Sequence, residues 1–231
     1  MNGYKFVHLP GIDSLLMEFK KCPFHPSKDT KFDSIFDSYH PPEDFPNLGN
    51  FTRCSWFLTE TNGPFGELVP KFKDAIAPLV HSFLDERPIL KKYYPIDKLR
   101  TSLGIHLYEL PEDDKKKGWM GLPEHMDVDI LTVLASDGPL DGFIEGEWRQ
   151  IEIPKDHVMV FTDLTTSAIT GERPLLHRVS VNNKFSIGAF IGAPSECKFE
   201  VTENADEVFE QFKGKTVGEF QNYYFTKGLK Y

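Results

Sequence analysis

The sequence predicts a mainly β fold, a sandwich or jelly roll, with helices packed on it. From residue 100 onward, short apolar runs of strand length recur, and Gly, Pro, Asp or Asn lies between most of them. Many short strands with punctuated turns favour a sandwich or jelly roll over a parallel α/β sheet. Before residue 100 and again in the tail, the apolar spacing is helical instead.

The N-terminal part is expected to contain little regular structure apart from one strand and one long helix. Residues 4–9 have the composition of a short strand, whereas residues 10–60 are rich in Pro, Asp and Phe with weak periodicity and predict an irregular covering layer. A helix is predicted over 66–86, because apolar residues recur there at close to i, i+4 and i+7 and Pro64 and Pro88 bracket the stretch.

The predicted strands and the tail helices follow after residue 100. The strands span residues 101–109, 129–136, 142–144, 148–153, 157–162, 176–182 and 184–192, and the tail helices span 204–212 and 216–225. Asn182-Asn183 between the last two strands predicts a tight hairpin, since Asn tolerates a positive φ.

One structural domain is expected, because the chain has 231 residues of which 40% are hydrophobic. Within it we distinguish a helical and irregular covering segment (1–99), a jelly-roll core (100–195) and a helical tail (196–231).

Composition excludes several classes of partner. The net charge is −9 and the basic residues are scattered, so no basic stripe for nucleic acid is expected. No window approaches the about 20 apolar residues that span a bilayer, so no membrane association is expected either. The three cysteines are far apart and odd in number, which favours a reducing compartment, and we expect the cytoplasm.

Two histidines and an aspartate are the candidate metal ligands. His125 and Asp127 are expected on one strand, where alternation directs both side chains to the same face, and His177 opens a later strand. Two imidazoles and one carboxylate are typical of a non-haem Fe(II) oxygenase, whose metal keeps positions open for substrate and oxygen. The alternative is that the histidines are core or surface residues paired to carboxylates. Asp129 shares the face of Asp127, but the His-x-Asp spacing favours Asp127.

Further motifs surround these ligands and carry a family resemblance. They are Gly121-Leu-Pro-Glu-His125-Met-Asp127, Leu131-Thr-Val-Leu134, Gly146-Glu-Trp148-Arg-Gln-Ile-Glu-Ile-Pro154, Val160-Phe-Thr-Asp163 and His177-Arg178-Val179. Together they resemble the Fe(II)/2-oxoglutarate-dependent dioxygenases, and in particular the branch that contains isopenicillin N synthase. The likeness spans roughly residues 100–195, and Thr216-Val-Gly-Glu-Phe-Gln in the tail is also similar to that branch.

The resemblance implies a double-stranded β-helix, the cupin-like jelly roll, with flanking helices and a catalytic core at 100–195. It also implies that His125, Asp127 and His177 hold Fe(II), and that 2-oxoglutarate and O₂ are co-substrates. Tyr108, in His106-Leu-Tyr108-Glu, is similar to the tyrosine that helps to hold the distal carboxylate of 2-oxoglutarate.

The main departure from the family lies where its Arg-x-Ser would be. Here the chain has Lys184-Phe-Ser186, and the hairpin before it is shorter than is usual in the branch. Lys184 and Ser186 alternate onto one strand face, so both remain candidates for 2-oxoglutarate binding. A lysine pairs with a carboxylate but lacks the bidentate fork of arginine. The alternative is an exposed hairpin lysine and no 2-oxoglutarate.

The resemblance implies oxidation of a small-molecule substrate by hydroxylation, desaturation or cyclisation, with succinate and CO₂ as co-products. The carboxylate of Asp127 argues against a halogenase. Arg173, four residues before His177, and Phe190, four residues after Ser186, are candidate substrate contacts. Two alternatives stay open: an Fe(II) oxidase that uses the triad without 2-oxoglutarate, and a catalytically inactive jelly-roll binding protein. The sequence does not name the substrate or the oligomeric state.

Overall fold

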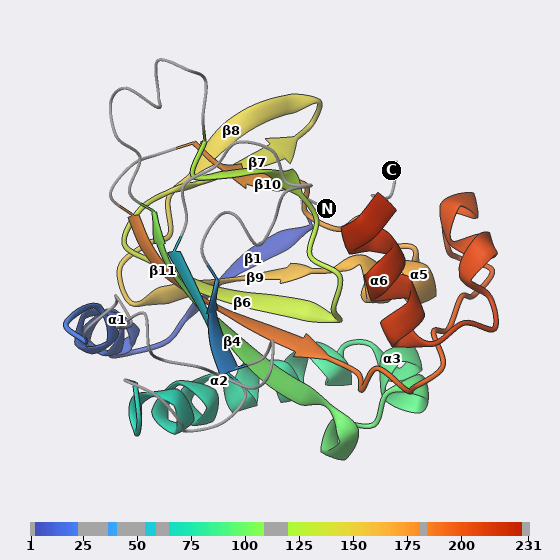
Figure 1. Cartoon of the computed structure of the whole chain (residues 1–231), viewed down its shortest axis with the longest axis horizontal. Coiled ribbons are helices and arrows are strands. Elements are labelled where there is room, and N and C mark those ends of the chain that lie inside the picture. Colours follow the sequence, from blue (N-terminus) through green and yellow to red (C-terminus); the bar gives the residue numbers. More distant parts are fainter. Residues whose placement is uncertain are drawn as a thin grey trace.

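The computed structural model describes residues 3–22, 37–40, 54–58, 65–108, 120–180 and 184–227. Within these residues two antiparallel sheets face each other (Figure 1). The larger sheet has the strand order β1-β9-β6-β11-β4-β3-β2, and the smaller sheet has the order β5-β10-β7-β8. This arrangement confirms the predicted mainly β fold with flanking helices.

The strands of the larger sheet are β1 (Tyr4–His8), β2 (Asp37–His40), β3 (Cys54–Leu58), β4 (Arg100–Tyr108), β6 (Leu131–Ser136), β9 (His157–Thr162) and β11 (Lys184–Gly192). The smaller sheet consists of β5 (Leu122–His125), β7 (Leu140–Ile144), β8 (Glu147–Ile151) and β10 (His177–Val179). The helices are α1 (Ile12–Lys20), α2 (Leu68–Asp85), α3 (Pro88–Tyr93), α5 (Leu164–Thr170) and α6 (Val217–Lys227), with short 3₁₀ turns η3 (Ile96–Lys98) and η4 (Glu207–Phe212).

The larger sheet separates two apolar layers, because side chains alternate along each strand. On β11, Phe185, Ile187, Ala189 and Ile191 belong to the main core under the helices. In Figure 1, α1 and α2 lie on the side of this sheet that faces away from β7 and β8. Helix α2 contributes Val69, Phe72, Ile76, Val80 and Phe83 to that core, at the spacing expected of an amphipathic helix.

A second, smaller apolar cluster lies between the two sheets. Its members come from both sheets and, in one case, from the connection before β10: Tyr108, Leu122, Leu134, Leu140, Ile144, Ile151, Met159, Phe161, Leu175 and Val179. The even-numbered residues of β4, β6 and β11 therefore face the smaller sheet. We call these positions the inner face of the larger sheet.

Three stretches contradict the irregular layer expected over residues 10–60. Helix α1 forms there because Ile12, Leu16 and Phe19 share one buried face, and β2 and β3 extend the edge of the larger sheet. Pro88 does not merely end a helix, because it opens α3 as its first residue. The predicted hairpin at Asn182-Asn183 lies outside the described residues.

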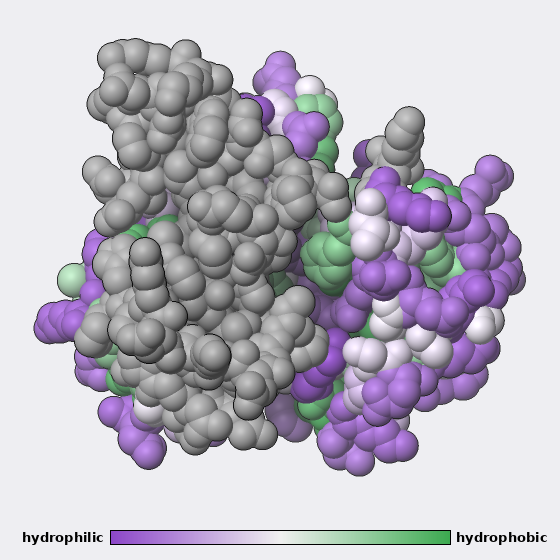
Figure 2. All heavy atoms as spheres, in the orientation of Figure 1, coloured by the Kyte–Doolittle hydropathy of each residue, from purple (hydrophilic) through white to green (hydrophobic). Residues whose placement is uncertain are grey.

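The described surface over α6 and the turns before it is mostly hydrophilic, with small separate hydrophobic patches (Figure 2). Phe225, which is 57% exposed, lies near the end of α6. In the part of the chain that the structure describes, no helix combines the length and the apolar character that crossing a membrane requires.

Candidate metal centre

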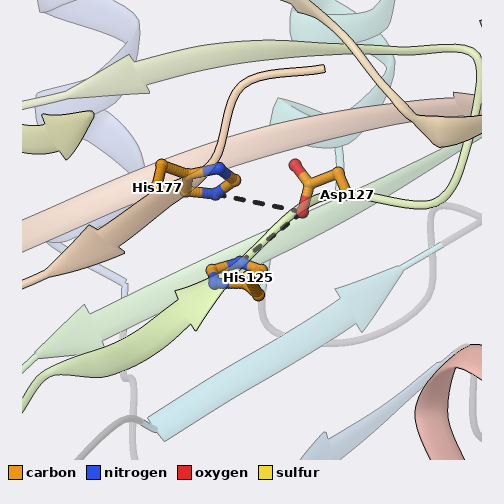
Figure 3. A group of neighbouring side chains, drawn as sticks. All are labelled: His125, Asp127 and His177. Atoms are coloured by element: carbon orange, nitrogen blue, oxygen red, sulfur yellow. Dashed lines mark ion pairs between the residues drawn. The ribbon is translucent and has the colours of Figure 1, made fainter. Parts of the chain in front are cut away.

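His125, Asp127 and His177 converge at one end of the smaller sheet (Figure 3). His125 ends β5 and lies directly opposite His177, the first residue of β10. The expectation that Asp127 shares a strand with His125 is wrong in detail, because β5 ends at His125 and Asp127 lies in the connection to β6. The side chains nevertheless meet, with one ligand atom of each residue within 4.8 Å of the others.

Backbone carbonyls fix both imidazoles in the same orientation. His125 Nδ1 lies 2.8 Å from the Pro123 carbonyl oxygen, and His177 Nδ1 lies 3.0 Å from the Leu175 carbonyl oxygen. A carbonyl oxygen only accepts, so each Nδ1 must donate. In the neutral imidazole, which is the form that binds metals, each Nε2 then carries a lone pair.

The three donors fit a first-row divalent metal ion such as Fe(II). Asp127 Oδ1 lies 3.6 Å from His125 Nε2 and 4.0 Å from His177 Nε2. Neighbouring ligands on a metal with bonds of about 2.1 Å stand about 3 Å apart. Small side-chain movements therefore close the site, and the donor set is the two-histidine, one-carboxylate set of non-haem iron enzymes.

Helix α5 holds the connection that carries Asp127. The backbone amides of Leu164 and Thr165 donate to the carbonyl oxygens of Asp127 and Asp129, at 2.9 and 3.0 Å. The hydroxyls of Thr165 and Thr166 donate to the carbonyl oxygens of Val128 and Ile130, at 2.7 and 2.6 Å. This irregular segment is therefore tied at consecutive carbonyls, which keeps Asp127 in place without a strand.

The second oxygen of Asp127 is occupied. Thr132 Oγ1 lies 2.8 Å from Asp127 Oδ2 and 3.0 Å from Asp163 Oδ2. Burial raises the pKa of Asp163 well above its usual range, and the charges of Asp127 and Asp129 raise it further.

Asp129 is not part of the group that the two histidines form with Asp127. Its Oδ1 accepts a hydrogen bond of 2.9 Å from Gln221 Nε2 of α6 and lies close to Gly192. Burial raises its pKa to about 6. Asp127 rather than Asp129 is therefore the carboxylate beside the histidines, as the His-x-Asp spacing indicates.

Helix α6 also hydrogen-bonds the backbone of Met126, which lies between His125 and Asp127. Tyr224 Oη donates to the Met126 carbonyl oxygen at 2.7 Å and accepts from the Met126 amide at 3.0 Å. Residues that are 98 positions apart in the sequence thus meet beside the candidate metal ligands.

We expect Tyr224→Phe to lower the free energy of unfolding by about 1–2 kcal/mol, because two partly buried backbone groups lose their partner. Chemical denaturation measures this change. Tyr223→Phe on the same helix is the matched control and should change the free energy of unfolding by less than about 0.5 kcal/mol. Equal losses in the two variants would show that the Tyr224 hydroxyl does not stabilise this segment.

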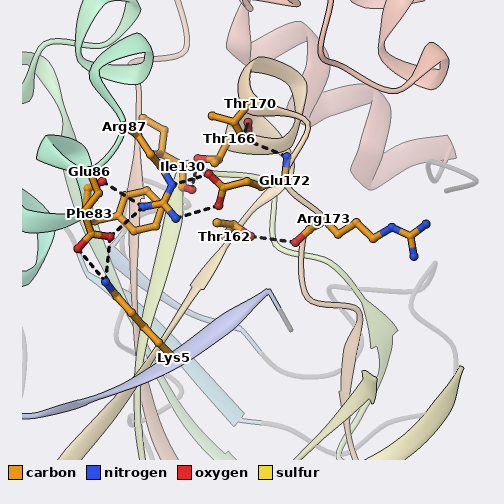
Figure 4. A network of polar contacts seen from close by, with 10 residues as sticks. All are labelled: Lys5, Phe83, Glu86, Arg87, Ile130, Thr162, Thr166, Thr170, Glu172 and Arg173. Atoms are coloured by element: carbon orange, nitrogen blue, oxygen red, sulfur yellow. Dashed lines mark hydrogen bonds and ion pairs between the residues drawn. The ribbon is translucent and has the colours of Figure 1, made fainter. Parts of the chain in front are cut away.

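An ion-pair network supports the chain as it approaches His177 (Figure 4). Arg87 Nε and Nη2 donate to the two carboxylate oxygens of Glu172, each at 2.8 Å, and its guanidinium lies 3.9 Å from the centre of the Phe83 ring. Thr162 Oγ1 donates a hydrogen bond to the Arg173 carbonyl oxygen at 3.0 Å. Figure 4 shows the Arg173 side chain extending away from this network, and it is exposed.

Lys184 is buried on the inner face, at the end of β11 where it pairs with Tyr108 of β4. Its ammonium donates to the Pro139 carbonyl oxygen at 2.9 Å and lies 5.6 Å from the centre of the Tyr108 ring. Among the described residues it forms no ion pair. The nearby carboxylates have other partners, since Asp137 pairs with Lys20 and Asp141 pairs with Arg178. Lys184 is thus not the exposed hairpin lysine of the alternative.

The inner face connects Lys184 to the metal ligands. Beyond Lys184 on β11 lie Ser186, Gly188 and Phe190. Ser186 stands opposite His106, and Phe190 stands opposite Thr132, which bonds Asp127. At the intervening position Gly188 pairs with Gly104, and an added Cβ at Gly104 would collide with the rings of His106 and Phe190.

Burial lowers the pKa of Lys184 to about 7, against the opposing effect of Asp137 and Asp141. The unfolded chain keeps the ordinary lysine pKa of about 10.4. Between these values the unfolded state binds a proton that the folded state has lost. Lys184 therefore destabilises the fold at neutral and lower pH, and this penalty is relieved as the pH rises from 7 to 10.

In the absence of ligands, the free energy of unfolding should rise between pH 7 and pH 9 by up to about 1.4 kcal/mol per pH unit from this group. Lys184→Met should lose that rise, because its side chain does not titrate. Urea unfolding of both proteins at several pH values measures it. Parallel pH profiles for the two proteins would contradict the titration of Lys184.

Several residues near the site were not candidates from the sequence. Thr132, Asp163 and His106 were visible in motifs but had no assigned role, although each lies at a strand position that alternation or a strand end could have suggested. Gln221 lies in the tail motif Thr216-Val-Gly-Glu-Phe-Gln but has no role assigned there, and Tyr224 lies in no motif. Only the tertiary fold brings these residues of α6 to residues 126–129.

No protein-family model matches the chain, and no curated protein matches it by sequence. Solved structures do match it across most of its length. JOX2, in complex with 2OG, Fe and JA, is 13% identical with a TM-score of 0.73, and the match covers 99% of this chain and 79% of that one.

Two further structures give the same result. The dioxygenase for auxin oxidation 1 from Arabidopsis thaliana, in a 2-oxoglutarate complex, is 17% identical with a TM-score of 0.66 over 91% of this chain and 90% of that one. A full-length Neurospora crassa protein, in complex with alpha-KG and 5-formyluracil, is 14% identical with a TM-score of 0.63 over 97% and 86%. The chain therefore has the double-stranded β-helix fold of the 2-oxoglutarate- and Fe(II)-dependent dioxygenases, with a candidate iron site formed by His125, Asp127 and His177.

Proposed function

We propose that the protein is a non-haem Fe(II)- and 2-oxoglutarate-dependent oxygenase that oxidises a small molecule and releases succinate and CO₂. The observation that carries the proposal is the convergence of His125 Nε2, His177 Nε2 and Asp127 Oδ1. Three ligands on one side of a metal leave the opposite side open for ligands from solution. When bound, ferrous iron supplies the activation of O₂ for the oxidation.

Lys184, Tyr108 and Ser186 are the proposed anchors for 2-oxoglutarate. A buried ammonium is costly unless an anion satisfies it, and the described residues offer Lys184 only a carbonyl oxygen. A carboxylate of the co-substrate would meet this charge, and Ser186, on the same strand face, would donate a hydroxyl hydrogen bond. Tyr108, whose ring lies 5.6 Å from the Lys184 ammonium, would be the third contact to the co-substrate.

Apolar side chains near the metal ligands would keep water from the reacting atoms. The Phe161 ring lies 5.2 Å from the His177 ring, and both Phe161 and Leu134 belong to the cluster between the sheets. Phe190 on the inner face and Arg173 before β10 stay our candidate substrate contacts. Phe190 has the stronger support, because it stands opposite Thr132, whose hydroxyl bonds Asp127.

We further propose that the chain belongs to the isopenicillin N synthase-like branch, acts on a small molecule and works in the cytoplasm. The sequence motifs around His125 and His177 support the branch. The small-molecule substrate is supported by the JA and 5-formyluracil complexes of similar folds. The division into 1–99, 100–195 and 196–231 likewise stays a prediction.

An Fe(II) oxidase that needs no 2-oxoglutarate is the second candidate, and the lysine at position 184 favours it, because lysine cannot form arginine's bidentate contact with a carboxylate. Succinate production separates the two. The protein, loaded with Fe(II) in air, is given 2-oxoglutarate and a panel of metabolites.

Succinate that forms only when Fe(II) is present would support the proposal. Substrate-dependent O₂ consumption without 2-oxoglutarate would instead identify the oxidase. A protein that binds no iron and consumes neither co-substrate would be the inactive jelly-roll binding protein.

A further inference from the structure

The carboxylate of Asp127 uses its two oxygens differently. Oδ1 faces the two imidazoles, whereas Oδ2 lies 2.8 Å from the Thr132 hydroxyl. Thr132 is 1% exposed and lies on β6, between β9 and β11 near the middle of the larger sheet. The hydroxyl therefore has a fixed position behind the carboxylate.

Proton counting at this hydroxyl constrains its neighbours. Thr132 Oγ1 also lies 3.0 Å from Asp163 Oδ2, so one hydroxyl stands between two carboxyl groups. A hydroxyl has a single proton to donate. If it donates to one carboxyl group, the other must carry a proton and donate to Oγ1 for both contacts to be hydrogen bonds.

Asp163 is the carboxyl group suited to carry that proton. Its side chain is 0% exposed, and among the described residues its Oδ1 has no hydrogen-bond partner. An ionised carboxylate in such a place would be strongly destabilising, whereas a neutral acid is tolerated. Asp127, in contrast, faces two imidazoles that share a metal with it under the proposed function.

We propose that Asp163 and Thr132 are positioning residues that form a hydrogen-bonded chain, from the Asp163 hydroxyl to Thr132 Oγ1 and from the Thr132 hydroxyl to Asp127 Oδ2. This chain holds Asp127 so that only Oδ1 is available to the metal. A carboxylate whose second oxygen is held binds through one oxygen and leaves the remaining positions open. The inference rests on the proposed iron site.

The start of α5 fixes the hydrogen-bonded chain in place. Asp163 precedes α5, and its own amide donates to the Ile130 carbonyl oxygen at 3.3 Å. The next amide, of Leu164, donates to the Asp127 carbonyl oxygen. Both ends of the chain are therefore anchored to the same short segment, and the loss of the Thr132 hydroxyl would free the carboxylate without moving the backbone.

Binding of Co(II), which is stable in air, tests the hydrogen-bonded chain without measuring catalysis. Titration gives the affinity, and the visible absorption of bound Co(II) reports its coordination. We expect Thr132→Val to weaken Co(II) binding about 10- to 100-fold, as the loss of a residue that orients a metal ligand does, and to change the absorption spectrum. Thr132→Ser restores the hydroxyl and should bind within about threefold of wild type.

Asp163→Asn tests the proton donor separately. A carboxamide N–H can donate to Thr132 Oγ1 as the neutral acid does, so this variant should also stay within about threefold of wild type. Thr202→Val is the matched control, because it removes a hydroxyl that bonds the Ile169 backbone rather than a ligand or the segment that carries Asp127. It should lower the melting temperature without weakening Co(II) binding.

Three results would overturn the inference: Thr132→Val binding Co(II) as wild type does, Thr132→Ser as weak as Thr132→Val, or Asp163→Asn as weak as Thr132→Val. If Thr132→Val does not fold, the serine and asparagine variants still decide by comparison with wild type, because Co(II) binding weakened by about tenfold or more in either variant would contradict the hydrogen-bonded chain. A wild-type protein that binds no Co(II) and no Fe(II) would instead contradict the proposed function itself.

Discussion

His177→Ala should lower Fe(II) affinity by more than about 100-fold, beyond what the loss of a supporting residue costs, and should abolish succinate production. The reason is that His177 supplies one of the three donors that meet among the described residues, and its Nε2 lone pair is directed at the site by the Leu175 carbonyl. Anaerobic titration with Fe(II) measures the affinity. Asp127→Asn should have a comparable effect, because it removes the negative charge from the ligand set.

His157→Ala is the matched control. His157 also opens a strand, and its Nδ1 lies 2.7 Å from the carbonyl oxygen two residues before it, as in His177, yet it lies outside the candidate site. It should bind Fe(II) as wild type does. Equal Fe(II) affinity in His177→Ala and wild type, with both folded, would show that His177 is not a ligand.

Lys184→Met should weaken 2-oxoglutarate binding about 100-fold while leaving Fe(II) affinity unchanged. A charged hydrogen bond to a carboxylate contributes about 1.5–3 kcal/mol, and every 1.4 kcal/mol is tenfold in affinity. Calorimetric titration of the Fe(II)-loaded protein under anaerobic conditions measures it. Because the pKa of Lys184 is lowered to about 7, wild-type affinity should also fall as the pH rises above 7.

Lys198→Met removes a lysine that is largely exposed and paired with Glu200, and it should leave 2-oxoglutarate affinity unchanged. If Lys184→Met binds 2-oxoglutarate as wild type does, Lys184 does not anchor the co-substrate. Weakened Fe(II) binding in the same variant would point to a general disturbance of the fold.

The sequence predicts the strands after residue 100 well, because their alternation reflects two different environments. On β11 the odd positions enter the core under the helices and the even positions face the smaller sheet. The elements of the N-terminal part are less predictable from the sequence. Helix α1 has only a short apolar face, Ile12, Leu16 and Phe19, within a stretch dominated by turn-forming residues.

The iron ligands were predictable as a set, but the way they are held was not. The spacing of His125 and Asp127 suggests one strand, whereas the chain leaves β5 between them and is fixed by α5 and by Tyr224. Such contacts join distant parts of the chain and leave no periodic trace. The burial of Lys184 is likewise a consequence of the tertiary fold, which places Pro139 and Tyr108 around it.

We propose that the triad holds Fe(II) with 2-oxoglutarate bound beside it. The most direct measurement is the visible absorption of the protein mixed with Fe(II) and 2-oxoglutarate without oxygen. We predict a charge-transfer band that is present in wild type and His157→Ala, absent in His177→Ala, and weakened at limiting 2-oxoglutarate in Lys184→Met. Normal Fe(II) binding with no such band at saturating 2-oxoglutarate would show that 2-oxoglutarate does not bind at the iron.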